Sequence, residues 1–264
     1  MCIVAVINVD KFQVINPTED WKYGTKMREY IANDFQLDLL WLFAVPVDGQ
    51  NPPMPPSPNE EPNEPPRVPV GYWAGDRVFV IQFEHSSCVQ TLLDAELVTE
   101  LQQRFPNAAT KVTENPHLID FALENFEHVR LPLFYKYPLH GGDALFPADR
   151  VWVMRNLTER WYARVDALLK EEDRCGPAVS FRSRLGLGDL LYADLGGTAT
   201  KVVTRPEARS TGLDGSMGQR VDVQPLDVVL NAVDAEEWVD LSEQAKECLK
   251  DMEMELDIAE SRYD

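Results

Sequence analysis

The chain has 264 residues, a formal net charge of −19 and a hydrophobic fraction of 44%. Because nucleic acids and anionic membranes are bound through Lys and Arg, this charge argues against both as partners and favours a basic partner. No basic segment precedes a long apolar stretch, and no stretch approaches the roughly 20 apolar residues that span a bilayer. We therefore expect no membrane segment and a cytoplasmic or nuclear location.

The four cysteines lie far apart along the chain, at Cys2, Cys88, Cys175 and Cys248. Their spacing matches neither a zinc site nor a compact disulfide framework. In an intracellular protein such thiols stay reduced. We therefore predict no structural metal, no disulfide and no cofactor.

The first 113 residues carry alternating sheet and helix patterns. In chain order these predict a β-hairpin, a short helix, a buried apolar segment, a proline-rich loop, a strand and a helix, at residues 3–15, 26–31, 37–45, 46–69, 78–83 and 94–105. The helix is the clearest of these elements, because Leu93, Leu97, Leu101 and Phe105 fall on one face and Pro106 stops the pattern.

Residues 46–69 hold ten of the nineteen prolines of the chain. Proline lacks a backbone donor for a sheet ladder, so this segment predicts a loop or polyproline conformation. The overlapping proline-x-x-proline spacings at 52–58 are of the kind that SH3 or WW domains bind. The alternative, which we favour, is a solvated insertion.

A similar series of patterns follows from about Val151. It predicts a hairpin at 151–156 and 160–165, a buried apolar segment, a glycine-containing loop, a strand and a final helix, at 185–193, 196–218, 221–229 and 238–259. The final helix repeats apolar residues every three to four positions, and its other face is acidic. That face predicts a solvated surface or a contact for a protein partner.

Four pairs of short segments recur in the same order, 140 to 151 residues apart. They are Val4–Asn8 with Trp152–Asn156, Asp38–Trp41 with Asp189–Tyr192, Gly71–Val80 with Gly215–Val223, and Asp94–Glu96 with Asp234–Glu236. This order predicts an α+β fold of two tandem copies, each a small antiparallel sheet with a helix, related by a pseudo-two-fold. The copies are residues 1–113 and 151–264. A further helical pattern at 119–129 lies in the connector, residues 114–150.

Several of these segments resemble a widespread family of uncharacterised fungal proteins. The resemblance rests on Arg155–Thr158, Trp161–Leu168, Gly186–Leu191 and the turn at Gly71–Val78. Bacterial relatives with one copy share the hairpin and the Trp-Ala-Gly-Asp-Arg turn. The resemblance implies an intracellular protein with a duplicated domain, and it implies no established activity.

The Trp-Ala-Gly-Asp-Arg turn is the best candidate for a ligand site, because Asp76 and Arg77 beside Trp73 are able to hold a polar ligand. The alternative is structural: a tight turn, with Trp73 as a core anchor. The second copy keeps an arginine at Arg220 and loses the acid, because Gln219 stands in its place. This favours the structural interpretation, in which each arginine is buried or ion-paired within its own copy.

His140 and Asp143 are the best candidates for acid–base chemistry, because they flank two glycines. A polar connector between the copies explains them equally, and we favour it. Residues 194–201, Asp-Leu-Gly-Gly-Thr-Ala-Thr-Lys, match a phosphate-binding turn of actin-like kinases. Only 63 residues follow Lys201, which is too few for the rest of such a domain.

The sequence supports two main classes of function, and a phosphate-binding, kinase-like protein with its site at residues 194–201 is a remote third alternative. The leading hypothesis is an intracellular interaction or ligand-binding protein without catalysis, which contacts protein partners through residues 46–69 or the acidic final helix. The alternative is an enzyme of unknown reaction with its site between the copies, lined by Asp76, Arg77, His140 and Asp143, since small-molecule sites tend to lie at domain interfaces.

Overall fold

The structure is a computed structural model of the chain. It describes residues 4–16, 35–46, 68–82, 89–129, 146, 149–168, 187–188, 190–191 and 218–250. The predicted helix at 26–31, most of the proline-rich loop and residues 194–201 lie outside the described residues.

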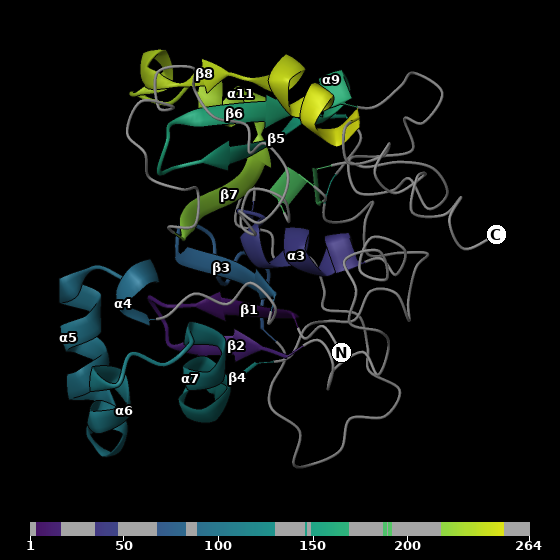
Figure 1. Cartoon of the computed structure of the whole chain (residues 1–264). Helices are drawn as coiled ribbons and strands as arrows, with labels where there is room; N and C mark the ends of the chain where they lie inside the picture. Colours follow the sequence, from purple (N-terminus) through teal and green to yellow (C-terminus); the bar gives the residue numbers. More distant parts are fainter. Residues whose placement is uncertain are drawn as a thin grey trace, which may run out of the picture.

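The described strands form one eight-stranded sheet, in the order β4-β2-β1-β3-β7-β5-β6-β8 (Figure 1). Their bounds are β1 Val4–Asn8, β2 Gln13–Ile15, β3 Arg77–Gln82, β4 Glu127–His128, β5 Trp152–Asn156, β6 Trp161–Arg164, β7 Gln219–Pro225 and β8 Val239–Asp240. Neighbouring strands are antiparallel except for β2 with β4 and β6 with β8, which are parallel. We call β1–β4 with their helices the first half, and β5–β8 with theirs the second half.

Short helices pack around this sheet and confirm the mixed α+β class. They are α3 Phe35–Phe43, α4 Val89–Leu92, α5 Ala95–Arg104, α6 Ala109–Thr113, α7 Leu118–Asn125, α9 Val165–Leu168 and α11 Leu226–Leu230, with 3-10 turns η2 Pro106–Ala108 and η6 Ala235–Glu237. Residues 187–188, 190–191 and 242–250 are also helical. Among the described helices, none is long and apolar enough to cross a membrane.

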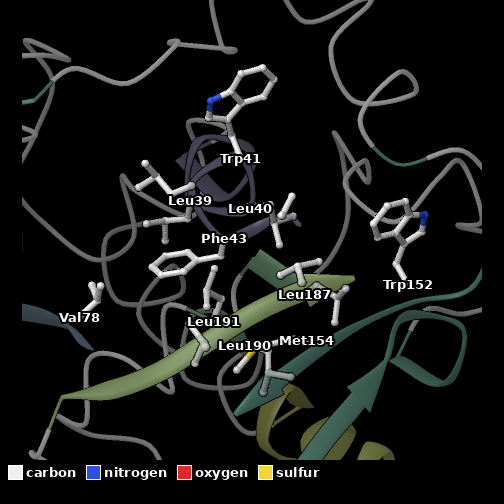
Figure 2. Packing of buried hydrophobic residues seen from close by; sticks show 14 of the residues in the cluster. Leu39, Leu40, Trp41, Phe43, Val78, Trp152, Met154, Leu187, Leu190 and Leu191 are labelled. Atoms are coloured by element: carbon white, nitrogen blue, oxygen red, sulfur yellow. The ribbon is translucent and has the colours of Figure 1, made fainter. Parts of the chain in front are cut away.

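Helix α3 lies at the centre of the larger hydrophobic core. Residues 39–43 are at most 2% exposed, as expected for a helix that is apolar on all sides. The predicted burial of segment 37–45 is thus confirmed for residues 39–44, whereas Val45 is only partly buried. Figure 2 shows α3 packing with Leu187, Leu190 and Leu191 beside β7, together with side chains of β3 and β5. We call this side of the sheet the α3 face.

The opposite side, the outer face, is covered in the first half by α4–α7. Because successive residues of a strand point to opposite faces, Ala5 and Ile7 belong to this second core while Val6 belongs to the α3 face. Four phenylalanines, Phe12, Phe105, Phe121 and Phe126, pack mostly edge to face beneath the helices. The first half therefore has a core on both faces of its strands.

The local predictions that rested on turn and cap residues are confirmed. Both hairpins are present, and the strand predicted at 78–83 is β3. Asp94 is the N-cap of α5, where its side chain accepts from the amide of Leu97, and Pro106 follows the end of the helix.

Two predictions in the second half are wrong at their boundaries. The strand predicted at 221–229 ends at Pro225, because proline has no N–H to continue the ladder, and α11 begins at the next residue. The helix predicted from Trp238 begins only after β8, at residue 242. There Asp240 accepts from the amide of Ser242, and this local bond favours the later start.

The predicted connector contributes to the sheet. Helix α7 packs on β1 and β2, and β4 follows at once and pairs with β2. The helical pattern predicted at 119–129 therefore ends at Asn125, where the chain turns into a strand. Residues 118–129 lie against the first half.

We predict that Gly71→Ala destabilises the protein more than Gly75→Ala. Both glycines have positive φ, +67° and +80°, which costs another residue about 1–2 kcal/mol. A Cβ at Gly71 would also lie 2.6 Å from the carbonyl oxygen of Ala44, whereas one at Gly75 meets only Leu157 at 3.7 Å. Overpacking against backbone adds about 1–3 kcal/mol for Gly71 alone. Urea unfolding of the three proteins measures the difference. Equal losses would show that the contact between Gly71 and Ala44 is not tight.

Candidate functional site

The turn at residues 71–76 is fixed by backbone hydrogen bonds to both halves. The amides of Gly71 and Trp73 donate to the carbonyls of Trp41 and Leu42 in α3, at 2.8 and 2.9 Å. The amide of Gly75 donates to Val221 in β7 at 2.9 Å. The turn therefore sits where α3, β3 and β7 meet, which is the junction between the halves.

Trp73 is fully buried and is a core residue. Its exposed fraction is 0%, and its indole Nε1 donates to the side-chain oxygen of Gln13 at 2.9 Å. Gln13 in turn donates to the carboxylate of Glu127 at 2.9 Å. With its face covered and its N–H satisfied, Trp73 offers no surface to a ligand.

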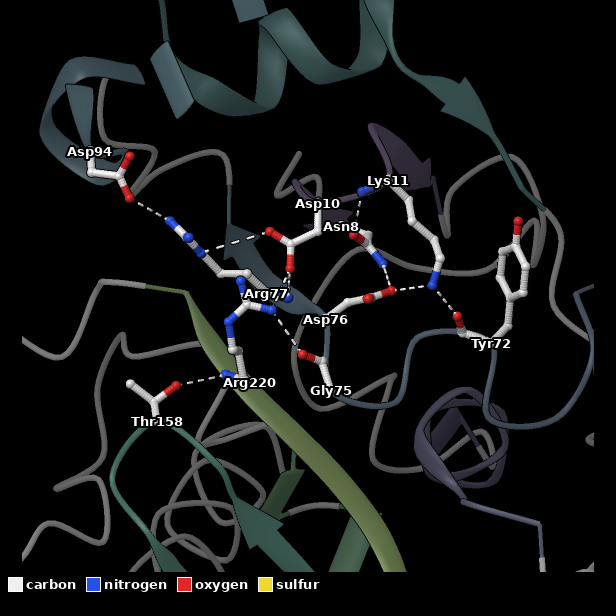
Figure 3. Close-up of polar contacts among 10 residues, drawn as sticks. All are labelled: Asn8, Asp10, Lys11, Tyr72, Gly75, Asp76, Arg77, Asp94, Thr158 and Arg220. Carbon is white, nitrogen blue, oxygen red and sulfur yellow. Dashed lines mark hydrogen bonds and ion pairs between the residues drawn. The ribbon is translucent and has the colours of Figure 1, made fainter. Parts of the chain in front are cut away.

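Asp76 accepts hydrogen bonds from two side chains of the first hairpin. The amide Nδ2 of Asn8 donates to it at 2.8 Å, and the ammonium group of Lys11 forms an ion pair with the same oxygen (Figure 3). Lys11 also donates to the carbonyl of Tyr72 and lies 4.7 Å from the centre of the Tyr72 ring. Asp76 thereby joins the hairpin turn to the junction turn.

Arg77 is ion-paired within the first half, as the structural interpretation expects. Its Nη1 donates to Asp94 at 2.8 Å, and its Nε lies 3.9 Å from Asp10. Its backbone amide donates to the Asp10 carboxylate at 2.8 Å. The side chain is 26% exposed and is therefore largely covered.

Arg220 differs from the expectation, because its ion pair crosses the junction. Its Nη1 donates to Asp10 at 2.5 Å and to the carbonyl of Gly75 at 2.9 Å, both in the first half (Figure 3). The pairing of β3 with β7 explains the difference, since it sets Arg220 directly opposite Arg77. From its own half, the Thr158 hydroxyl accepts from the Arg220 amide at 2.9 Å, and the Leu157 amide donates to the Arg220 carbonyl at 2.7 Å.

The electrostatics of Asp94 favour a structural role for this carboxylate over acid–base chemistry. Asp94 accepts from the Leu97 amide and from Arg77, and these bonds lower the pKa of its carboxyl below the ordinary value. General bases work best with a pKa near the operating pH, so a carboxyl shifted downward is poorly suited to that role. The cluster can hold charges in place, and each carboxylate in it already has a cationic partner.

The structure does not test the other predicted site residues. His140, Asp143 and residues 194–201 all lie outside the described residues. Within the described part of the chain, no group of three or more His, Cys, Asp or Glu side chains is arranged to hold a metal ion.

A second polar cluster, which the sequence analysis missed, lies on the outer face of the second half. Arg155 in β5 makes a two-pronged ion pair with Asp222 in β7, at 2.9 and 2.7 Å. The two side chains are only 14% and 8% exposed. The guanidinium also lies 4.5 Å from the ring centre of Trp238, and Gln224, with its amide oxygen turned inward, accepts from Arg155 Nε at 2.7 Å.

The signal for this cluster was present in the sequence. Asp222 and Gln224 alternate with Val221 and Val223 in a segment predicted to be a strand, so one face had to be polar. A charged residue on one strand indicates a partner on the next strand, but only the register identifies Arg155 as that partner.

Comparison of the chain with models of protein families, with curated proteins and with solved structures found no match.

We predict that two replacements of Asp94 distinguish the stability due to its charge from the stability due to its capping hydrogen bond. At pH 7, Asp94→Asn keeps a capping acceptor and loses the ion pair, which is half exposed and contributes about 0.2–1 kcal/mol. Asp94→Ala also loses the cap, for about 1 kcal/mol more. Because the folded-state pKa is lowered, the stability due to the charge is present above the ordinary pKa of 3.8 and is lost as the pH falls through the folded value.

Urea unfolding at pH 7 and well below pH 3.8 checks this prediction. The gap between the native protein and Asp94→Asn is expected to close in acid, whereas the gap between Asp94→Asn and Asp94→Ala remains. Glu100→Gln, an exposed change on the same helix, is the control. A gap that stays constant with pH would show that the carboxylate charge does not stabilise the fold.

Proposed function

We propose that this protein is an intracellular interaction protein without catalysis, cytoplasmic or nuclear, built from two tandem copies of one domain. The strand order supports the duplication. From the centre of the sheet outward, the first half runs β3, β1, β2 and β4, and the second half runs β7, β5, β6 and β8, so strands in the same place in the two halves follow the same order along the chain. Corresponding strands also pair in corresponding registers. Val6 lies opposite Ile15 and Val80, while Met154 lies opposite Ala163 and Val223.

Backbone conformation and hydrogen bonds support the same correspondence. Phe12 and Arg160, which occupy the same place in the two hairpins, have positive φ of 55° and 58°. The amide of Val9 donates to Arg77, and that of Leu157 donates to Arg220. At the edges, the parallel pairing of β4 with β2 has its counterpart in the pairing of β8 with β6.

One observation carries the non-catalytic part of the proposal. In the first half the Asn8 side chain donates to Asp76, and in the second half the corresponding Asn156 donates to Gln219 at 3.1 Å. An amide thus takes the place of the carboxylate in the same hydrogen bond. A general base or a metal ligand would lose its chemistry in this exchange, whereas a structural acceptor keeps its role.

We propose that protein partners bind the acidic surface of the final helix. The helix at 242–250 buries Ala245 and Leu249 and exposes Glu243 and Glu247. With a chain charge of −19, such a surface favours basic partners and accelerates their association. Residues 46–69 are the second proposed contact segment.

The proposed correspondence predicts which replacement the buried ion pair tolerates. Arg155 and Asp222 occupy the places of Ile7 and Phe79, which face each other in the first half. Arg155→Ile or Asp222→Phe alone strands a buried charge, at a cost of about 3–5 kcal/mol. The double variant, Arg155→Ile with Asp222→Phe, has the same apolar pair as Ile7 and Phe79. It is expected to recover most of the stability that either single variant loses. Urea unfolding of the four proteins forms a double-mutant cycle.

The matched control for this cycle is the exposed pair Lys111 and Glu124, in which each single change is expected to cost less than about 1 kcal/mol. If the double variant at 155 and 222 is as unstable as the worse single variant, the two positions are not equivalent to 7 and 79.

The function itself predicts binding without turnover. Asp76→Asn, which imitates the amide of the second half, is expected to fold and to keep the partners of the native protein. The purified full chain, incubated with a cell metabolite extract, is expected to convert no compound that mass spectrometry follows. Affinity capture, followed by rebinding of each captured protein in purified form, measures the interaction.

A compound converted by the native protein and not by Asp76→Asn, at unchanged melting temperature, would overturn the non-catalytic proposal. Absence of any partner that rebinds in purified form would overturn the interaction function. Deletion of 47–67 serves as the second variant, and unchanged partners after that deletion would remove the proline-rich segment as a contact.

A further inference from the structure

The two halves cover their outer faces with different lengths of chain. Residues 83–126 link β3 to β4 and include α4–α7. Residues 226–238 link β7 to β8 and include only α11 and the η6 turn. We call residues 226–240, which end with β8, the cap. Figure 1 shows the cap at the opposite end of the sheet from α5 and α6.

The cap carries the exposed large hydrophobic side chains of the described chain. Val228, Leu230 and Val239 are 42%, 55% and 39% exposed, and Val233 is fully exposed. In the described residues outside the cap, the large hydrophobic side chains do not reach this level of exposure. Beneath them, Leu226, Val229 and Trp238 pack on Val153 and Tyr162, so the inner side of the cap is already filled. The four exposed side chains therefore take no part in this inner packing.

The same fifteen positions carry five carboxylates and no Lys, Arg or His. They are Asp227, Asp234, Glu236, Glu237 and Asp240. Arg160 of the adjoining hairpin pairs with Glu237, and the Trp238 indole donates to Asp234. The apolar side chains are thus set among a strong excess of negative charge.

We infer that the cap is a docking surface for a basic amphipathic helix of a protein partner. This inference rests on the interaction function proposed above. Apolar residues of the partner would contact Leu230 and Val233, while its Lys and Arg side chains would meet the surrounding carboxylates. A helix is the expected shape, because an amphipathic helix presents apolar and basic side chains on adjoining faces, which complements the apolar and acidic side chains of the cap.

Other occupants carry the wrong charge. A second copy of the chain brings the same carboxylates to the surface. Residues 251–264 hold six carboxylates and one arginine, so they are repelled as well. Nucleic acids and anionic membranes are polyanions. A basic partner is the occupant that satisfies both the apolar and the charged groups.

The test uses an 18-residue peptide with Leu on one helical face and Lys on the other, labelled for fluorescence anisotropy at about 150 mM salt. Two cap variants of the full chain are compared, Leu230→Ser with Val233→Ser, and Asp227→Asn with Glu236→Gln. These residues are exposed, so the fold is expected to be kept. The control, Glu100→Gln with Glu114→Gln, removes the same charge from exposed positions of the first half.

Both cap variants are expected to weaken binding about tenfold or more, and the control about twofold or less. Absence of binding by the native chain would overturn the docking surface. So would equal weakening by the control, or equal affinity for a scrambled peptide of the same composition, since both indicate unspecific charge attraction.

The outcome is separable from that of the proposed function. If affinity capture gives partners that rebind in purified form and the cap variants keep all of them, the docking surface is wrong and the interaction function stands. If the native chain has no such partner, the interaction function fails by its own test.

Discussion

The continuity of the eight-stranded sheet depends on the contact between β3 and β7, which joins the two halves. Only two residue pairs join these strands, Arg77 with Arg220 and Val78 with Gln219, so backbone pairing alone would hold the halves weakly. Helix α3 supplies the rest. It belongs to the first half, yet it continues into Ala44, which bridges Val223 of β7, and its apolar side chains pack against strands of both halves. Burying each Leu or Phe contributes about 1.5–3 kcal/mol, so separation of the halves would expose apolar side chains of the larger described core.

The same contact creates an electrostatic problem that the charged turn residues solve. Antiparallel pairing sets Arg77 directly opposite Arg220, and like charges across a strand pair repel. Asp10 lies between them and binds the Arg220 side chain and the Arg77 amide, while Asp94 takes the Arg77 side chain. Asp10 therefore places a carboxylate between the two arginines. This arrangement gives Asp76 and Arg77 of the Trp-Ala-Gly-Asp-Arg turn ion-pair partners within the chain.

The parts of the fold that could be predicted from sequence are those with a local cause. The hairpins follow from alternating apolar residues and a polar turn, and α5 follows from its cap at Asp94 and its stop at Pro106. The start of the final helix was misplaced because Trp238 fits the helical spacing, while the pairing of β8 with β6 holds the next residues extended. Spacing within one segment carries no information on such a distant partner.

In the candidate site, too, contacts with a local cause could be predicted from the sequence, whereas contacts between distant strands could not. The burial of Trp73 and the ion pair of Arg77 within its half follow from residues near the turn and could be expected. The contact of Arg220 with Asp10 joins residues far apart in the chain, and it arises only when β3 meets β7. The ion pair of Arg155 with Asp222 likewise needs the register of β5 against β7.

The outer faces show how strand sequence and connection length are matched in each half. In the first half, α5 and α7 are long enough to seal the outer face from water, and the strands beneath present apolar pairs such as Ile7 with Phe79. In the second half the short cap covers less, and the corresponding places hold Arg155 and Asp222, which remain 14% and 8% exposed. Because the cap covers Arg155 and Asp222 only in part, the ion pair keeps some of its hydration. The ring of Trp238 lies against the guanidinium of Arg155. The same pair beneath α5 and α7 would be desolvated more completely and would cost more than the apolar pair it replaced.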